Sequence, residues 1–277
     1  MYCDLHTHSH FSDGTYSPAE LIAEAESLGL SAIALTDHNT VAGLPDFVAA
    51  GRESSVQAVP GCEFSTDYNG VELHILGLFI SQEHYETVTA LLEKAQLEKE
   101  QSNRDLVAVL NENGYDLDYG EICSRCRGRI NRAHIAAALV EKGYFVNMQQ
   151  AFQGPLSAKA GFYRPPKRMD AYACIRFIKS IGAVAVLAHP FLDLDETALR
   201  AFLPEAVLAG LDGMEVLYSK YSTQTTATAM AVAADFGLKC SGGSDFHGSN
   251  KPDIALGTGR GNLAIPHAWL EALKTRT

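Results

Sequence analysis

Apolar and polar positions along the chain follow a pattern that occurs three times. A helical stretch with an apolar stripe is followed by a glycine, a short β-rich run and then a polar residue that could bind a metal. Glycine suits the left-handed conformation at the end of a helix, so each unit predicts a helix, a tight loop and a parallel strand. The three units run from Ala19 to His38, from Tyr172 to His189 and from Thr226 to Asp245.

Four further β-rich runs raise the predicted number of strands to about seven, separated by helices. They cover Tyr2–His6, Val56–Glu63, Val71–Phe79 and Gly213–Leu217. The first helix has a strong start signal, because Ser17, Pro18 and Glu20 provide a capping serine, a proline at N1 and the glutamate of a capping box. Polar residues at the C-terminal ends of many strands favour a barrel over an open sheet.

Residues from about 83 to 170 interrupt this alternation. A long polar helix from Glu83 to about Asn113 precedes a basic stretch, a helical segment at Ala133–Lys142 and a loop containing glycine and proline. None of these segments has a strand signal. We therefore predict an α/β chain with the first part of a barrel at residues 1–94, a mainly helical insert at 95–170 and the second part of the barrel at 171–277.

Composition narrows the class of protein. The 277 residues are 47% hydrophobic, which is enough for a sizeable core, and the longest apolar runs are too short to cross a bilayer. The first residues lack the pattern of a signal peptide, and six scattered cysteines do not resemble a disulfide scaffold. We expect a cytoplasmic enzyme. The pair Cys123 and Cys126, with no second pair nearby, is better explained as ordinary thiols than as a zinc or redox site.

Charge is distributed unevenly along the chain. The net charge of −11 disfavours binding to long nucleic acid. Between Arg125 and Arg168, however, nine Lys and Arg residues face a single acid, Glu141, which gives this segment a charge of +8. A basic segment can bind a second phosphate of a substrate, or it can be a solvated helix face, and the sequence leaves both alternatives open.

Candidate metal ligands recur where strands end. His6 and His8 are two residues apart after a strand, so both imidazoles project from one face, and Asp245 and His247 repeat this spacing. Any single histidine is more often an ordinary hydrogen-bonded imidazole. Recurrence at successive strands predicts a metal cluster instead. The other candidates are Asp13, Asp37, His38, Glu63, His74 and His189.

These segments resemble the PHP family, named for polymerase and histidinol phosphatase, in family order along the chain. The matching motifs are Asp4-Leu5-His6-Thr7-His8, Thr36-Asp37-His38-Asn39, Gly61-Cys62-Glu63, His74-Ile75-Leu76-Gly77, Leu187-Ala188-His189-Pro190 and Gly243-Ser244-Asp245-Phe246-His247. The resemblance implies a distorted (β/α)7 barrel, a metal-dependent phosphoesterase activity and a centre of three divalent ions. Manganese is the first candidate, with iron or zinc as alternatives, because the ligands are imidazoles and carboxylates without thiolate.

The resemblance also implies a role for each ligand. His6, His8, Glu63 and Asp245 would hold the first ion, Glu63, His74 and His189 the second, and Asp13, His38 and His247 the third. The nucleophile would be hydroxide generated at the metals. Asp37 or His134 is the candidate that protonates the leaving group.

One PHP branch is especially similar in layout, namely short bacterial proteins that act as 3′,5′-nucleotide bisphosphate phosphatases or as 5′ to 3′ exoribonucleases on short RNA. By this resemblance the 3′-phosphate would lie at the metals, the 5′-phosphate would contact Arg104, Arg132 and His134, and the product would be a nucleoside 5′-monophosphate. The expected partner is thus a small nucleotide or short RNA, with no membrane, long nucleic acid or protein partner inferred.

Three alternatives remain open at this point. Histidinol phosphate would also suit a small pocket, although its cationic amine needs carboxylates rather than a basic segment. A metal-stabilised RNA-binding module without turnover is the alternative outside enzymes, and aromatic residues such as Tyr144 and Tyr163 fit it. An amide-hydrolysing relative shares the His-x-His strand, but such enzymes bridge two metals with a lysine, whereas Glu63 occupies that position here.

Overall fold

The computed structural model describes residues 1–125, 130–164 and 168–275, which form two compact units. The first unit, here called the barrel unit, consists of Met1–Ala90 and Arg168–Thr277. The second, here called the helical unit, is Leu91–Lys167. Part of the CxxC pair and of the basic segment lies outside the described residues, namely Cys126, Arg127, Arg129 and Lys167.

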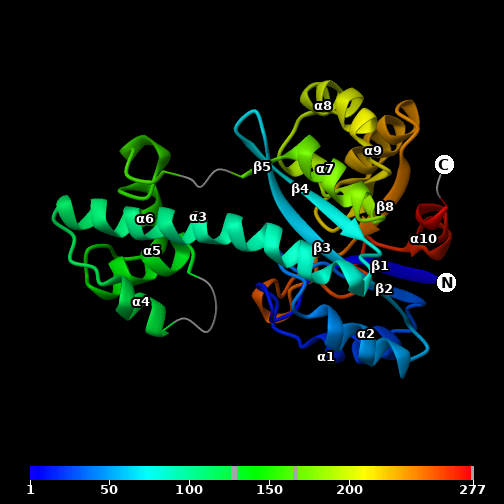
Figure 1. Ribbon diagram of the computed structural model, residues 1–277, viewed down its shortest axis with the longest axis horizontal. Coiled ribbons are helices and arrows are strands. Elements are labelled where there is room, and N and C mark those ends of the chain that lie inside the picture. The colour runs from blue at the N-terminus through cyan, green and yellow to red at the C-terminus, as the bar shows by residue number, and fades with distance from the viewer. Residues whose placement is uncertain (126–129, 165–167, 276–277) are drawn as a thin grey trace. The chain divides into compact units, whose positions relative to one another are not determined.

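One sheet forms the centre of the barrel unit (Figure 1). The first three strands, β1 to β3, pair parallel, and so do β6, β7 and β8. The sheet is nearly closed, because His8 N donates to Phe246 O (2.9 Å) and Asp245 N donates to His6 O (2.9 Å). In sheet order the strands are β8 (Lys239–Gly243), β7 (Gly213–Tyr218), β6 (Val184–Leu187), β4 (Val71–Leu78), β3 (Gln57–Tyr68), β2 (Ala32–Leu35), β1 (Tyr2–Thr7) and β9 (Ile265–Pro266), with β5 (Met169–Asp170) beside β3. The predicted α/β barrel is confirmed.

The connection between β3 and β4 differs from the prediction that helices separate the strands. These two strands pair antiparallel over eight residue pairs and are joined by a tight turn at Asn69 and Gly70, whose φ angles are 53° and 85°. Asn-Gly is a strong signal for a two-residue hairpin because both residues tolerate positive φ. The two-residue strands β5 and β9 were also absent from the prediction.

Helices of the barrel unit pack beside the strands, with the predicted signals at their ends. At α1 the capping box is present, since Ser17 N donates to Glu20 Oε2 (2.7 Å) and Glu20 N donates to Ser17 Oγ (3.2 Å). The glycines that end the three predicted helices, Gly29, Gly182 and Gly237, have φ of 70°, 70° and 65°. The helices are α1 (Pro18–Ser27), α2 (Leu44–Arg52), α7 (Ala171–Ser180), α8 (Glu196–Ala209), α9 (Thr223–Asp235) and α10 (His267–Lys274).

Close approach between β8 and β1 closes the sheet at the C-terminal ends of these two strands. A Cβ atom at Gly243 would lie 2.1 Å from the Cβ atom of His6, so a larger residue cannot occupy this position without moving β1. A buried apolar core fills the other end, with side chains from β1, β2, β3, β4, β6, β9 and α10. This division leaves polar side chains at one end of the barrel and hydrophobic ones at the other.

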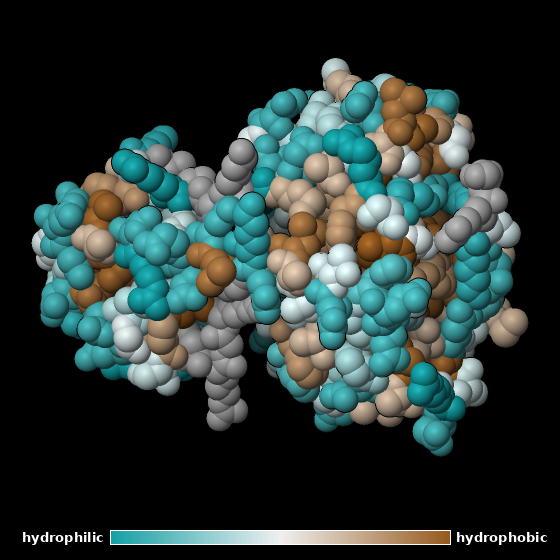
Figure 2. Space-filling view, viewed as in Figure 1, coloured by the Kyte–Doolittle hydropathy of each residue, from teal (hydrophilic) through white to brown (hydrophobic). Residues whose placement is uncertain are grey.

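The helical unit has a hydrophobic core of its own. Leu106 and Leu110 of α3 pack with Ile135 and Leu139 of α5, all nearly inaccessible to solvent. Its elements are α3 (Tyr85–Glu112), which begins within the barrel unit, α4 (Tyr119–Arg125), α5 (Arg132–Glu141), α6 (Met148–Gln153) and a short 3₁₀ turn at Ala158–Ala160. On the face drawn in Figure 2, hydrophobic residues mostly form separate patches among hydrophilic ones. Within the described ranges, every helix is too short or too polar to cross a membrane.

Candidate metal centre

Nine of the predicted metal ligands gather at one end of the barrel unit. They come from β1, β3 and β4 and from the segments that follow β1, β2, β6 and β8, so residues far apart in sequence meet where the strands end. Their ligand atoms form four overlapping groups in which all atoms lie within 4.8 Å of one another. The groups are His8, Asp13, His38 and His247; His6, Glu63 and His189; His6, His8 and Asp245; and His38, Glu63 and His74.

The Glu63 carboxylate lies at the centre of this cluster and is fully buried. Its Oε1 is 2.7 Å from His74 Nδ1 and 3.1 Å from His189 Nε2. Its Oε2 is 3.0 Å from His38 Nδ1, 3.2 Å from His6 Nε2 and 3.3 Å from His8 Nε2. One carboxylate therefore contacts five imidazoles with its two oxygens, which is the arrangement needed to bridge two cations.

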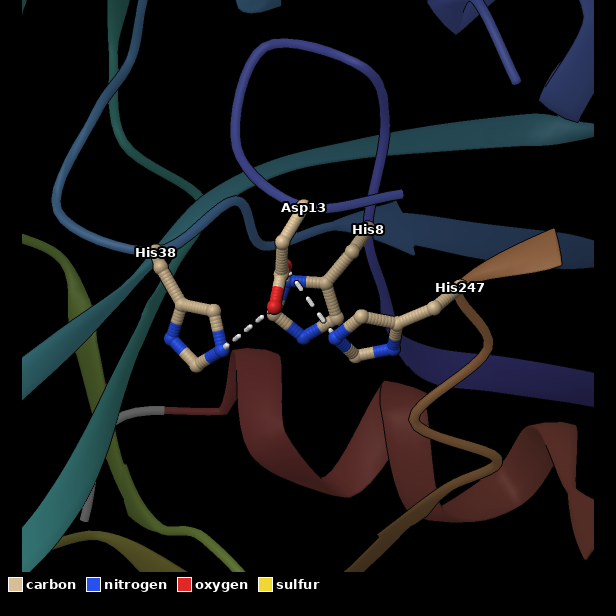
Figure 3. A group of neighbouring side chains, drawn as sticks. All are labelled: His8, Asp13, His38 and His247. Carbon is tan, nitrogen blue, oxygen red and sulfur yellow. Dashed lines mark ion pairs between the residues drawn. The ribbon is translucent and has the colours of Figure 1, made fainter. Parts of the chain in front are cut away.

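Asp13 and three imidazoles form a more open group at the edge of the cluster (Figure 3). The carboxylate points toward His247 and His38, with Oδ1 3.1 Å from His247 Nε2 and Oδ2 3.9 Å from His38 Nε2. The Asp13 side chain is 56% exposed, whereas His8 and His247 are buried. Solvent can therefore reach the cluster from the side of Asp13.

Several polar atoms of the cluster are oriented toward a shared point and not toward one another. His6 Nε2 and His8 Nε2 are 3.1 Å apart, and two unprotonated ring nitrogens at that distance cannot satisfy each other. Among the described residues, buried His8 Nδ1, Glu63 Oε2 and His247 Nε2 have no hydrogen-bond partner of acceptable geometry despite their close neighbours. Imidazole and carboxylate donors of this kind fit divalent transition metals.

Protonation of the imidazoles compensates the buried acids when no metal is bound. Burial opposes the charged form of His8 and His74, but neighbouring carboxylates outweigh it, and the pKa of His8 rises to about 9 and that of His74 to about 10. Burial would raise the pKa of Glu63, yet the surrounding imidazoles hold it well below its usual range. At neutral pH these imidazoles carry protons that must leave when a metal binds.

Glu215, which the sequence analysis missed, holds two candidate ligands in place. Its side chain is fully buried in β7, where Oε1 lies 3.1 Å from His6 Nδ1 and Oε2 accepts a hydrogen bond from His189 N (2.7 Å). Because His6 Nδ1 is engaged by this carboxylate, its Nε2 is free to face the cluster. The signal in the sequence was a single glutamate within the otherwise apolar strand Gly213–Leu217.

Asp245 presents its two oxygens to different neighbours. Oδ1 is 3.3 Å from His8 Nε2, whereas Oδ2 accepts hydrogen bonds from Tyr218 OH and Lys251 Nζ, both at 2.8 Å. The backbone at Asp245 has a φ of 58°, and His189 has a φ of 26°. Positive φ is unfavourable for residues with a side chain and is typical of functional sites, where the surrounding structure enforces it.

The two candidates for proton transfer, Asp37 and His134, lie in different units of the chain. Asp37 accepts hydrogen bonds from Ser9 N (2.8 Å), Ser9 Oγ (2.6 Å) and Ser12 Oγ (2.5 Å), and it thereby orders the loop that carries Asp13. In the helical unit His134 accepts a hydrogen bond from Asn131 N (3.1 Å) at the start of α5. The catalytic roles of Asp37 and His134 remain predictions.

Arg104 and Arg132 both lie in the helical unit, with their guanidinium groups over aromatic rings. Arg104 is 4.4 Å from the ring centroid of Tyr119, and Arg132 is 4.3 Å from that of Tyr163. Arg104 also forms an ion pair with Glu100 (2.6 Å). Several other charges of the basic segment are paired with acids, namely Arg125 with Glu141, Lys142 with Asp116 and Arg168 with Glu72. The segment is therefore less free to bind anions than its charge of +8 indicates.

Three similar proteins are named as enzymes that hydrolyse phosphoesters. The chain is 31% identical to a 5′-3′ exoribonuclease of Haemophilus influenzae (88% of this chain, 89% of that protein). It is 32% identical to a phosphoribosyl 1,2-cyclic phosphate 1,2-diphosphodiesterase of Eggerthella lenta (90% and 95%). It is 29% identical to a 3′,5′-nucleoside bisphosphate phosphatase of Chromobacterium violaceum (88% and 86%).

A solved structure and a family model agree with these relatives. A metal-dependent phosphoesterase of Bifidobacterium adolescentis has a similar fold, with a TM-score of 0.77, 27% identity and coverage of 98% of this chain and 94% of that one. The family model named PHP domain matches residues 4–154, which contain six of the nine clustered ligands. The chain therefore belongs to the PHP domain family and is a metal-dependent phosphoesterase.

Proposed function

We propose that the nine clustered side chains hold three divalent cations, with manganese as the first candidate and iron or zinc as alternatives. The observation that supports this most directly is the convergence of buried ring nitrogens and one carboxylate oxygen, Glu63 Oε2, that lack hydrogen-bond partners among the described residues. The sequence-based assignment of ligands to ions overlaps with the four geometric groups without coinciding with them. The geometry also places His8 with the third set, and it groups His74 with His38 and His189 with His6, each beside Glu63.

Divalent cations at this centre would supply Lewis acidity that activates water and neutralises the charge of a phosphoryl group. The protein itself supplies orientation. Glu215 fixes the ring of His6, Tyr218 and Lys251 fix one oxygen of Asp245, and Asp37 fixes the loop of Asp13. Positioning of this kind supports hydrolysis without a covalent intermediate on a side chain.

We propose that the substrate is a nucleoside 3′,5′-bisphosphate, which would lose its 3′-phosphate to give a nucleoside 5′-monophosphate. Support comes from the bisphosphate phosphatase of Chromobacterium violaceum and the 5′-3′ exoribonuclease of Haemophilus influenzae, whose names describe a nucleoside bisphosphate and RNA as substrates. A related activity on short RNA, removing nucleotides from the 5′ end, is part of the same proposal. The 5′-phosphate would contact Arg132, with Arg104 and His134 as further candidates.

Substitution of Arg132 by alanine tests this assignment. We expect the KM for adenosine 3′,5′-bisphosphate to rise about tenfold, because one charge-assisted hydrogen bond to a phosphate is worth roughly 1.5–3 kcal/mol. The kcat/KM for a simple phosphomonoester such as p-nitrophenyl phosphate should remain near the wild-type value. Exposed Arg176 on α7 provides a matched control, since Arg176→Ala removes the same charge from the barrel unit.

Equal losses on both substrates in Arg132→Ala would contradict the role in binding the second phosphate. Preference for histidinol phosphate over the bisphosphate would retain the metal chemistry and replace the substrate. Preference for a cyclic ribose phosphate, the substrate type named for the Eggerthella lenta relative, would likewise retain the metal chemistry and replace the proposed substrate. Tight RNA binding by metal-loaded protein without turnover would favour the binding-module alternative.

A further inference from the structure

The cluster of metal-ligating side chains faces a cavity of about 280 Å³ in the barrel unit. Imidazoles of His38, His74 and His189 contribute to its inner wall. Two lysines, Lys220 and Lys251, line the same cavity, although neither stood out in the sequence. The carboxylates of Glu72, Asp193 and Asp245 line the cavity as well, and the two ammonium groups are the lining groups that can donate charge-assisted hydrogen bonds to the oxygens of a bound anion.

Lys251 is held directly beside the centre. Its Nζ donates to Asp245 Oδ2 at 2.8 Å, and that oxygen also accepts from Tyr218 OH, while the other oxygen of Asp245 faces His8. The Lys251 side chain is 30% exposed, so part of it borders the open cavity. An ammonium group has three donors, which leaves capacity for a ligand that enters the cavity.

Lys220 lies on a backbone that is fixed on both sides. It follows β7 between Ser219 and Tyr221, which are 2% and 7% exposed. The Asn262 side-chain amide donates to Ser219 O (3.3 Å) and Tyr221 O (3.5 Å), and Ser219 Oγ donates to Ser244 O (2.6 Å). Across residues 1–125, 130–164 and 168–275, no salt bridge within 4.0 Å involves Lys220 Nζ, although its charge interacts at longer range with that of Asp253.

We propose that Lys220 and Lys251 bind the non-bridging oxygens of the phosphoryl group that is hydrolysed, and afterwards the inorganic phosphate that is released. This inference rests on the proposed function, because it places the scissile phosphoryl group between the ligand cluster and the two lysines. Both ammonium groups donate hydrogen bonds to anionic oxygens, which are stronger than hydrogen bonds between neutral groups. The site differs from the subsite proposed for the second phosphate, whose candidate residues belong to the helical unit.

Lys220→Met is the variant that tests this site, since Lys251 also holds Asp245. In manganese-loaded protein, inorganic phosphate should bind about tenfold more weakly to the variant by isothermal titration calorimetry, with metal content unchanged. The KM for a monoester and for a bisphosphate should rise by the same factor, because both substrates carry the scissile group. Lys220→Arg should restore most of the phosphate affinity. The control Lys274→Met removes an exposed charge on α10 and should leave phosphate binding unaltered.

Unchanged phosphate affinity in Lys220→Met would overturn the proposal. A rise in KM confined to bisphosphates would also overturn it, because Lys220 would then contact the second phosphate. Loss of bound manganese would assign Lys220 to the integrity of the centre instead and would likewise contradict the proposal. The calorimetric measurement uses inorganic phosphate alone, so an error in the proposed organic substrate would leave this test unaffected.

Discussion

Substitution of Glu63 by glutamine is expected to lower phosphoesterase turnover by roughly 10³-fold, the size expected when several kcal/mol of charge stabilisation at a phosphoryl group is lost. Glutamine has nearly the same shape as glutamate, but its amide nitrogen cannot bind a cation. Glu63 contacts five imidazoles, so the change affects each of the sites proposed around it. The measurement is steady-state hydrolysis together with metal content by mass spectrometry.

The matched control for Glu63→Gln is Asp212→Asn. Asp212 is also a largely buried carboxylate, but it accepts hydrogen bonds from Lys179 Nζ and Ala185 N, away from the cluster. The control is expected to unfold at a lower temperature and to retain metal-dependent turnover. Near-normal turnover in Glu63→Gln with bound metal would contradict the bridging role of Glu63.

Removal of the metals should lower the thermal unfolding temperature by roughly 10 °C without unfolding the protein at 25 °C. Ligands that bind only the folded state add about 4 kcal/mol when their concentration is a thousand times the Kd, and each kcal/mol shifts Tm by about 2–4 °C in a chain of this size. We expect the metal-free protein to stay folded, because protonation of His8 and His74, whose pKa values are raised, would offset the charges of Glu63 and Asp245. Calorimetric unfolding with manganese and with a chelator measures the difference.

Glu63→Gln supplies the internal control for that experiment as well. Because its centre is incomplete, its Tm should respond much less to manganese or to the chelator than the wild-type Tm does. An equal response in both proteins would mean that the metal stabilises the fold through some other site.

Much of the barrel could be predicted because local signals agree with the final structure. The helix ends at Gly29, Gly182 and Gly237 have the left-handed conformation that the pattern indicated, and the strands that follow them are those predicted. The signal for the hairpin at Asn69 and Gly70 was equally local, and interpreting that pair as a turn would have predicted the antiparallel pairing of β3 and β4.

Other features depend on contacts between distant residues, and no single segment encodes them. Glu215 lies 209 positions from His6, and its pairing with His6 arises only when β7 and β1 approach each other across the barrel. The same is true of Lys220 beside the ligand cluster and of the acids that neutralise Arg125 and Lys142. Net charge along a segment could not reveal which of its side chains are already paired.

The activity proposed for this metal centre is hydrolysis of the 3′-phosphate of nucleoside bisphosphates. The most direct measurement is phosphate release from adenosine 3′,5′-bisphosphate, 3′-AMP, 5′-AMP and histidinol phosphate by manganese-reconstituted protein, with a chelated sample beside it. We expect metal-dependent release that is fastest from the bisphosphate, with 5′-AMP as the product. Release that persists after chelation, or a clear preference for 5′-AMP or histidinol phosphate, would contradict it.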